Sequence, residues 1–341
     1  SDSMRDPIRI GLFGFGRIGR NIFRQAYKNP KFEIVAISDL GQAEAMHYLL
    51  MRDSIHGIMD DEIVLEGECL KYNNHSVRLL AGEKPGNVPW GAFDIDIVID
   101  STGAYRLREE LQPHLDAGAK RILVSKPPID KIDRTIIKGI NDEEIQPTDK
   151  IISTTSSTTQ VLALMLKILD ETFGVKQAMM TTVHAYTSDQ PLADAVNSDL
   201  RRSRSAVRNI IPNETWAPDY VSQLMPQFNN KLTGMAINVP VANGSCVDLT
   251  TEMEEMPSIE AVNAAFKSAS ENGLRNIIGY TEDPIVSSDA IGSGNTMVFD
   301  SQATMIASGK LLKTISWFDN GWGFANRIID LADAYASLGE S

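Results

Sequence analysis

The pattern of hydrophobic and polar positions changes character about halfway along the chain. In the first part, short apolar runs predict buried strands at residues 8–13, 32–37, 95–100 and 121–125. Unbroken apolar runs joined by helices are typical of a parallel sheet. After Gly174 the predicted strands are longer and partly alternating, at residues 178–186, 232–241, 245–253 and 296–306. This second pattern favours a mainly antiparallel sheet.

These two patterns predict an α/β protein. The first part is expected to form a Rossmann-type doubly wound parallel sheet, and the second an α+β catalytic domain with a mainly antiparallel sheet. A chain of 341 residues is too long for one typical core and fits two domains.

A glycine-rich turn follows the first predicted strand. Gly14, Gly16 and Gly19 lie between that strand and a helix expected over 17–28. Such glycines serve the tight turn, the close approach to a pyrophosphate and the packing of helix on strand. Gly14, Gly16, Arg17 and Ile18 are therefore predicted cofactor contacts.

Polar residues at the carboxyl ends of other strands extend this dinucleotide site. Asp39 lies twenty residues after Gly19, where a carboxylate accepts a hydrogen bond from the ribose 2′-hydroxyl and repels a 2′-phosphate. NAD is therefore favoured over NADP. Thr102, Gly103 and Ser125 follow two later strands and are further candidate contacts, because the cofactor lies along such strand ends.

A nucleophile site is predicted at the start of the second part. Ser157 follows the apolar residues Ile151 and Ile152 and opens an apolar helix that ends at Phe173. At a helix N-terminus, backbone N–H groups and the helix dipole stabilise an anion. His184, on a predicted strand, is the candidate base.

Four motifs resemble the glyceraldehyde-3-phosphate dehydrogenase family: Gly14–Arg20, Ser153–Gln160, Met180–Gln190 and Ser316–Phe324. The resemblance extends over nearly the whole chain. It implies NAD-dependent oxidation of a phosphorylated aldehyde such as glyceraldehyde 3-phosphate, with Ser157 as nucleophile, His184 as base and Asn320 holding the nicotinamide carboxamide. The family has a cysteine at position 157.

The resemblance also implies the domain limits and the assembly. An NAD-binding domain would comprise residues 4–156 and 321–341, with a helix over 324–338, and a catalytic domain residues 157–320. In the family, the segment matching 185–212 packs between subunits, so we expect a homotetramer.

The two anion sites that the resemblance implies are only partly present. Matching positions are Ser156, Thr158, Thr187, Asp189, Arg202 and Thr215. Asn238 replaces an arginine and Trp216 a glycine, so inorganic phosphate and water both stay open as acyl acceptor. Three further departures are Gln160 and Phe13, each for an asparagine, and Phe324 for a tyrosine.

Composition and charge narrow the function classes. The net charge of −13 argues against broad binding to nucleic acids. No apolar stretch approaches the roughly 20 residues that span a bilayer, and no apolar signal core precedes Arg9, so a cytoplasmic location is expected. Cys69 and Cys246 lack metal-ligand spacing, so no metal site is predicted, and Cys246 is expected to be a packing residue.

Two functions stay open at this stage. The first is an NAD-dependent aldehyde dehydrogenase in which Ser157 is either native or introduced, since Ser1-Asp2-Ser3 before Met4 is typical of a cloning remnant. The second is a catalytically silent NAD-binding paralogue that acts as a sensor or assembly partner, because a serine hydroxyl is a much weaker nucleophile than a thiolate.

Overall fold

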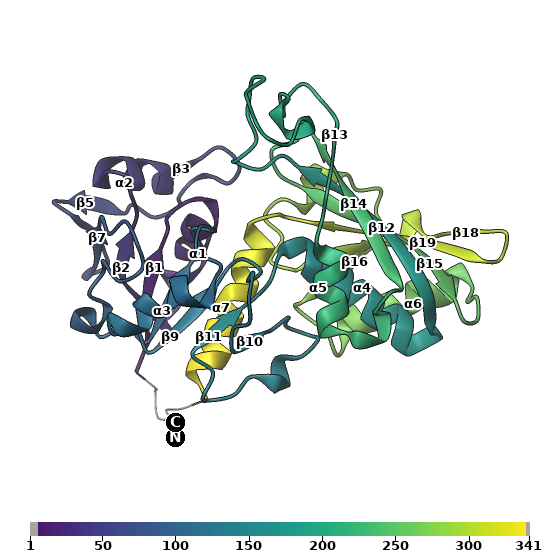
Figure 1. Ribbon diagram of the computed structural model, residues 1–341, viewed down its shortest axis with the longest axis horizontal. Helices are drawn as coiled ribbons and strands as arrows, with labels where there is room; N and C mark the ends of the chain where they lie inside the picture. Colours follow the sequence, from purple (N-terminus) through teal and green to yellow (C-terminus); the bar gives the residue numbers. More distant parts are fainter. Residues whose placement is uncertain (1–5, 339–341) are drawn as a thin grey trace. The chain divides into compact units, whose positions relative to one another are not determined.

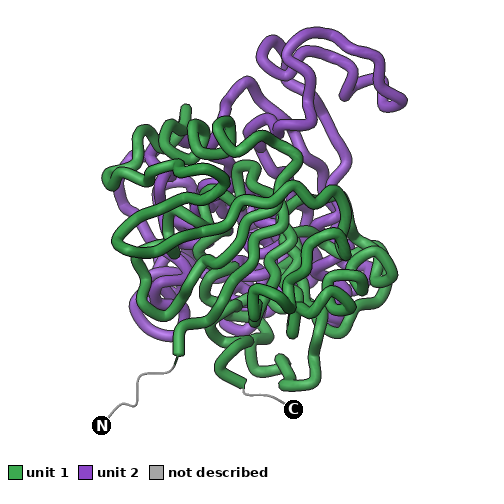
Figure 2. The backbone as a smooth tube through the Cα atoms, turned by 90° about the vertical axis from the view of Figure 1, so that its left-hand side faces the viewer, with its two compact units in different colours: residues 1–155, 325–341 green, residues 156–324 purple. Residues whose placement is uncertain are grey.

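The computed structural model describes residues 6–338, and the chain divides into two compact units (Figure 2). Unit 1 comprises residues 1–155 and 325–341, and unit 2 comprises residues 156–324. The predicted domain limits lie within a few residues of these bounds in the sequence. Which domain serves the cofactor and which serves the chemistry stays a prediction.

Unit 1 is built, within the described residues, on a nine-stranded sheet of order β10-β11-β9-β8-β1-β2-β7-β6-β5 (Figure 1). All neighbours from β10 to β7 are parallel, whereas β7, β6 and β5 are antiparallel. The strands are β1 (Ile8–Phe13), β2 (Phe32–Ser38), β5 (Val64–Glu66), β6 (Cys69–Tyr72), β7 (His75–Leu80), β8 (Ile97–Asp100), β9 (Arg121–Val124), β10 (Arg134–Thr135) and β11 (Ile151–Ser153). A separate ribbon pairs β3 (Arg52–Asp53) with β4 (Gly57–Ile58). The predicted doubly wound sheet is confirmed.

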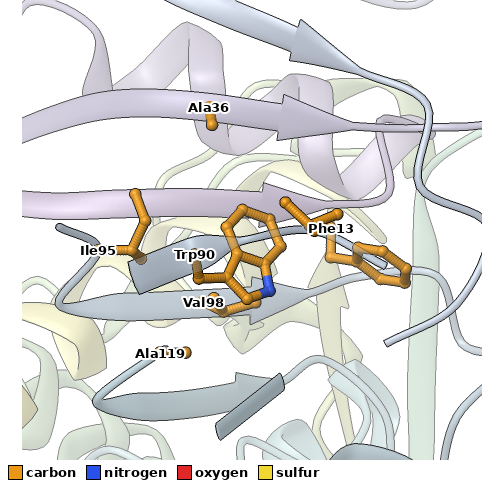
Figure 3. Packing of buried hydrophobic residues seen from close by; sticks show 7 residues of the cluster. Phe13, Ala36, Trp90, Ile95, Val98 and Ala119 are labelled. Carbon is orange, nitrogen blue, oxygen red and sulfur yellow. The ribbon is translucent and has the colours of Figure 1, made fainter. Parts of the chain in front are cut away.

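Trp90 lies at the centre of one core cluster of unit 1 (Figure 3). Its indole is fully buried and packs with Phe13, Val98 and Ala119. Burying such a side chain contributes about 1.5–3 kcal/mol. A Cβ on Gly11 would lie 2.5 Å from the indole, so the first strand needs a glycine there for the ring to fit.

The helices of unit 1 are α1 (Arg17–Ala26), α2 (Ala43–Met51), α3 (Arg108–Asp116) and the part of α7 (Trp322–Ala336) from Ala325 onward. The last helix carries a stripe of apolar residues at helical spacing, and these are buried: Phe324, Ile328, Leu331 and Tyr335. Within unit 1, the Arg121 guanidinium lies 4.7 Å from the centre of the Tyr335 ring, and the Tyr335 hydroxyl donates to the carbonyl of Asp149. These contacts hold the last helix at the amino ends of β9 and β11.

Unit 2 is built, within the described residues, on an eight-stranded sheet of order β13-β14-β12-β15-β19-β17-β16, with β18 paired to β19 (Figure 1). Most neighbours are antiparallel, but β12 with β14 and β16 with β17 are parallel. The strands are β12 (Val175–Ala185), β13 (Ile211–Asn213), β14 (Leu232–Val239), β15 (Ser245–Met253), β16 (Ile278–Thr281), β17 (Met297–Asp300), β18 (Met305–Ala307) and β19 (Leu311–Phe318). The helices are α4 (Ser157–Phe173), α5 (Ala217–Leu224) and α6 (Ile259–Glu271).

The prediction of a single strand over 296–306 is wrong, because this segment forms two short strands, β17 and β18. The Asp300 carboxylate accepts the backbone N–H of Gln302, and the Ser301 hydroxyl donates to the carbonyl of Thr281. These bonds turn the chain into a 3₁₀ turn at Ser301–Ala303, which separates β17 from β18. The sheet also contains β19, whose alternating buried positions were not recognised as a strand.

Other details of the described residues do not alter the site. Short 3₁₀ turns lie at Trp90–Phe93, Asp142–Glu144, Arg201–Ser203, Pro226–Phe228, Ser287–Ala290 and Ser301–Ala303. Over residues 6–338, no helix combines the length and the apolar character that crossing a membrane requires. Cys246 is buried in β15, as expected, and burial raises the pKa of its thiol to about 11.

Candidate active site

The three glycines after β1 occupy different environments. Gly14 has a φ of +99°, which favours glycine, and a Cβ on Gly19 would lie 2.4 Å from the carbonyl oxygen of Gly14. A Cβ on Gly16 would meet no atom within 4 Å. Gly16 is the N-cap of α1 and supplies no capping side chain, while Arg17 and Ile18 form the first helical positions. The loop therefore combines open space with helix N–H groups, which fits a pyrophosphate.

Asp39 lies where β2 ends and links this strand to the glycine loop. One carboxylate oxygen accepts the backbone N–H of Phe15 at 2.7 Å, and the other accepts the N–H of Gly41 at 3.0 Å. Asp39 is half-buried. A carboxylate has about four acceptor positions, so lone pairs stay available for a ribose hydroxyl.

Thr102 and Gly103 follow β8, and Thr102 lies against the same loop. The Ser101 hydroxyl donates to the carbonyl of Gly14 at 3.1 Å, and a Cβ on Gly14 would lie 3.0 Å from Thr102 Cγ2. Ser125 is buried at the end of β9, where its N–H donates to the carbonyl of Asp100. The structure thus brings the predicted contacts of unit 1 to the carboxyl ends of β1, β2, β8 and β9.

The predicted nucleophile opens the longest helix of unit 2. Ser156 is the N-cap of α4, and its hydroxyl oxygen accepts the N–H of Thr159 at 3.2 Å. Ser157 is the first helical residue and is half-buried, whereas Thr158 is buried. Thr155, two residues earlier, has a φ of +59°, which is strained for a β-branched residue.

His184 lies near the end of β12 in a fixed orientation. Its Nδ1 lies 2.6 Å from the carbonyl oxygen of Ala185, and a carbonyl can only accept, so Nδ1 carries the proton. Its Nε2 lies 3.0 Å from Nδ2 of Asn320. An amide nitrogen can only donate, so Nε2 is an acceptor and the imidazole is the neutral Nδ1–H tautomer.

Asn320 is oriented by the turn before β15. Its Oδ1 accepts the Ser245 hydroxyl at 2.9 Å and the Gly244 N–H at 3.2 Å. The Asn320 N–H donates to Oδ1 of Asn243 at 3.0 Å. The Gly244 N–H can only donate, so the atom that it meets is the amide oxygen and the NH₂ group points to His184.

Asn213, Asn238 and the residues of this turn were not predicted to orient the base. Asn238 Nδ2 donates to the carbonyl of Ala185 at 3.4 Å, and Asn213 donates to Oδ1 of Asn238 at 3.4 Å. Asn238 thus stands beside the acceptor of His184. The Asn-Gly dipeptide at 243–244 is typical of a turn, but only the pairing of β15 with β19 brings it to Asn320.

The predicted anion residues form separate groups. Thr187 and Arg202 both donate to the carboxylate of Asp189. Burial alone would raise the pKa of this carboxyl, but the hydrogen bond from Thr187 and the charge of Arg202 outweigh it and lower the pKa. Thr215 accepts the N–H of Ala217 at the start of α5.

Some predicted neighbours are not in contact. Among the described residues no hydrogen bond joins the Ser157 hydroxyl to His184. Trp216 is 61% exposed, so its indole extends into solvent. Phe13 and Phe324 are buried, as packing residues are, and Gln160 is buried in the first turn of α4. In residues 6–338, no group of three or more His, Cys, Asp or Glu is arranged to hold a metal ion.

Comparisons with known proteins relate both parts of the chain to the same proteins. Residues 8–108 match the family model of the glyceraldehyde 3-phosphate dehydrogenase NAD binding domain, and residues 156–320 match that of its C-terminal domain. The chain is 44% identical to glyceraldehyde-3-phosphate dehydrogenase of Geobacillus stearothermophilus over 333 residues, which are 97% of this chain and 99% of that protein. It is 43% identical to the protein of that name in Priestia megaterium and 42% identical to glyceraldehyde-3-phosphate dehydrogenase 1 of Bacillus subtilis, with the same coverage.

The glycine loop generates a paired prediction. Gly19→Ala should lower the free energy of unfolding by about 1–3 kcal/mol, because its methyl group would overlap the carbonyl of Gly14. Gly16→Ala should cost less than about 1 kcal/mol, since nothing occupies that space and only an N-cap glycine is lost. Its NAD affinity should nevertheless fall by about tenfold or more, because the methyl group would hold the pyrophosphate away. Denaturant unfolding and calorimetric titration measure the two effects, and unchanged NAD affinity in Gly16→Ala would place the pyrophosphate elsewhere.

Proposed function

Because the chain belongs to the glyceraldehyde-3-phosphate dehydrogenase family, we propose that it oxidises glyceraldehyde 3-phosphate or a close phosphorylated relative, with Ser157 as nucleophile. The chain is an NAD-dependent oxidoreductase of this family, and NAD is its cofactor. The residues that would hold NAD are Gly14, Gly16, Arg17, Ile18, Asp39, Thr102, Gly103 and Ser125 in unit 1 and Asn320 in unit 2. When bound, NAD accepts the hydride.

The proposed role of Ser157 is covalent. Its oxygen adds to the aldehyde carbon while its proton passes to Nε2 of His184, and loss of the hydride leaves an acyl ester on the serine. Attack by phosphate or water then breaks this ester. The proton from His184 returns to the serine oxygen, which restores both side chains.

The observation that carries this proposal is which ring nitrogen of His184 carries the proton. The carbonyl of Ala185 holds the proton on Nδ1, and Asn320 donates to Nε2. A neutral imidazole with an unprotonated Nε2 is the form that can accept a proton from a hydroxyl. The first turn of α4 supports the same chemistry, because its N–H groups and positive dipole end would stabilise the oxyanion.

We place the substrate anions at the residues that match the family sites: Ser156, Thr158, Thr187, Asp189, Arg202 and Thr215. Two features weaken binding of a second phosphate. Asn238 is neutral and its amide is engaged with Ala185 and Asn213. Trp216 places a bulky, exposed side chain at the N-cap of α5, where the family has a glycine.

The position of Ser157, which makes no hydrogen bond to His184 in the part of the chain that the structure describes, favours a second candidate function. This is a silent NAD-binding paralogue that acts as a sensor or assembly partner. A serine needs a base in hydrogen-bond contact during attack, and the described structure shows no such bond to His184. This candidate retains NAD binding and lacks aldehyde oxidation, so the variant at position 157 described below separates the two.

We further propose a homotetramer in the cytoplasm. Apolar side chains of the segment 185–212 lie at the surface of unit 2, with Leu192 and Ile210 each 69% exposed and Leu200 81% exposed. Exposed apolar groups concentrated in one segment are typical of a subunit interface. The location rests on the sequence alone.

Cofactor preference tests Asp39. The unmodified protein should bind NAD much more tightly than NADP, because the carboxylate would face the 2′-phosphate with like charge. Asp39→Ala should narrow that preference by about tenfold, equivalent to about 1.4 kcal/mol. Calorimetric titration with both cofactors measures it, and equal affinities in the unmodified protein would refute the assignment of Asp39.

Substitution at the nucleophile position tests the enzyme proposal. Ser157→Cys should raise NADH formation from glyceraldehyde 3-phosphate by at least about a thousandfold, since the start of α4 and His184 favour a thiolate. Adding His184→Gln to this variant should remove most of the gain. Turnover of the single variant should depend only weakly on inorganic phosphate.

Each result has a contrary outcome. No NADH from Ser157→Cys across a panel of aldehydes would favour the silent paralogue. Strong phosphate dependence would show that Trp216 and Asn238 do not weaken the phosphate site.

The proposed assembly is measured by light scattering. A protein of four chains, each of 37.5 kDa, should have a mass of about 150 kDa at micromolar concentration. The double variant Leu192→Asp with Leu200→Asp should lower that mass, because it charges the exposed apolar segment. A monomer in the unmodified protein would contradict the tetramer.

A further inference from the structure

A chain of buried hydrogen bonds lies directly behind the cofactor loops of unit 1. The Trp90 indole donates to Nδ1 of His114 at 3.0 Å, and Nε2 of His114 lies 3.0 Å from Oδ2 of Asp100. The side chains of His114 and Asp100 are both completely buried. An indole can only donate, so His114 accepts at Nδ1 and donates its Nε2 proton to the carboxylate.

The other oxygen of Asp100 holds Thr102. It accepts both the backbone N–H of Thr102 at 3.1 Å and its hydroxyl at 2.7 Å. The Thr102 hydroxyl oxygen in turn accepts the N–H of Ala104 at 3.2 Å. The Asp100 carboxylate therefore fixes Thr102 through two hydrogen bonds, one from its backbone N–H and one from its hydroxyl.

The same network contacts the glycine loop. Phe13, the residue before Gly14, packs edge-on against the imidazole of His114, with ring centres 4.7 Å apart, and its ring also approaches Trp90 (Figure 3). Thr102, which is itself exposed, packs against Gly14. The two loops are thus held together, and the side chains of Phe13, His114 and Asp100 that support them are buried.

Stability alone does not account for a buried carboxylate at this place. Removing a carboxylate from water is costly even when it is fully hydrogen-bonded, and apolar replacements of buried polar groups are often neutral or stabilising. The three donors around Asp100 are aimed so that the backbone after β8 has one conformation. Second-layer groups that orient a binding loop have this arrangement.

The strand order indicates which half of the cofactor depends on this network. Asp39 follows β2, and Thr102 follows β8, on the opposite side of β1. A dinucleotide crosses such a sheet where the strand order reverses, here between β1 and β8. The adenosine half then lies toward Asp39, and the pyrophosphate and nicotinamide ribose lie toward Thr102.

We propose that His114 and Asp100 are positioning residues that hold the Thr102 loop against the glycine loop for the pyrophosphate and nicotinamide half of NAD. The proposal rests on the NAD-binding role of unit 1. The role of these two residues differs from that of the predicted cofactor contacts, because neither side chain is accessible to the cofactor.

The test compares binding of NAD with binding of AMP, which carries only the adenosine half. His114→Leu has similar volume and removes both hydrogen bonds, so it should weaken NAD binding by about tenfold or more and change AMP binding less than about twofold. His114→Gln can accept from Trp90 and donate to Asp100, so it should restore NAD binding to within about threefold. Asp100→Asn keeps the side-chain shape and should likewise weaken NAD binding while changing AMP binding little. This variant tests the proposal if His114→Leu does not fold.

Tyr335→Phe is the matched control. It removes another buried hydrogen bond of unit 1, to the carbonyl of Asp149, at the amino ends of the strands. It should lower the melting temperature and leave NAD binding unchanged. Equal losses of NAD and AMP affinity in the His114 variants, or unchanged NAD affinity, would overturn the proposal. Failure of the unmodified protein to bind NAD would instead refute the cofactor assignment.

Discussion

The hydrogen bond from Nδ1 of His184 to the carbonyl of Ala185 is the constraint on which the chemistry proposed for unit 2 depends. It fixes the tautomer, so Nε2 becomes the acceptor, and it fixes the ring plane at the end of β12. The fold supplies both supports: β14 pairs in parallel with β12 and brings Asn238 to the same carbonyl, while β15 pairs with β19 and brings Ser245 to Asn320. The proposed base on one strand is therefore oriented by residues from strands distant in the sequence.

In unit 1 the equivalent constraint is that the carboxyl ends of neighbouring parallel strands lie together, so that the loops that follow them are in contact. The Asp39 carboxylate joins the end of β2 to the glycine loop after β1, and the buried carboxylate of Asp100 holds the loop after β8. The two acids differ in exposure. Asp39 is half-buried and suits direct contact with a ribose, whereas Asp100 is sealed behind Phe13 and His114 and can act only through Thr102. Both depend on a parallel sheet that brings the carboxyl ends of its strands to one edge.

Local signals made much of this predictable. The apolar run of β1, the spacing of Gly14, Gly16 and Gly19, and Gly174 at the end of α4 act within a few residues, so the sequence reveals them directly. The turn at Asp300 was missed because a side-chain bond to Gln302 competes with the strand that its apolar neighbours favour. The supports of Asn320 and the network from Trp90 to Thr102 could not be predicted, because the register of distant strands and helix α3 brings those residues together. Ser157 was found from its motif, yet its distance from the base is a tertiary property that no local pattern contains.

The tautomer of His184 can be measured from the imidazole ¹⁵N shifts of the protein, whose five histidines can be assigned by single substitutions such as His184→Gln. Neutral His184 is expected to carry its proton on Nδ1, while His114 in the same spectrum carries it on Nε2 and so provides an internal reference. If the proton of His184 is instead found on Nε2, the imidazole cannot accept the proton of Ser157, and the role proposed for this residue is wrong.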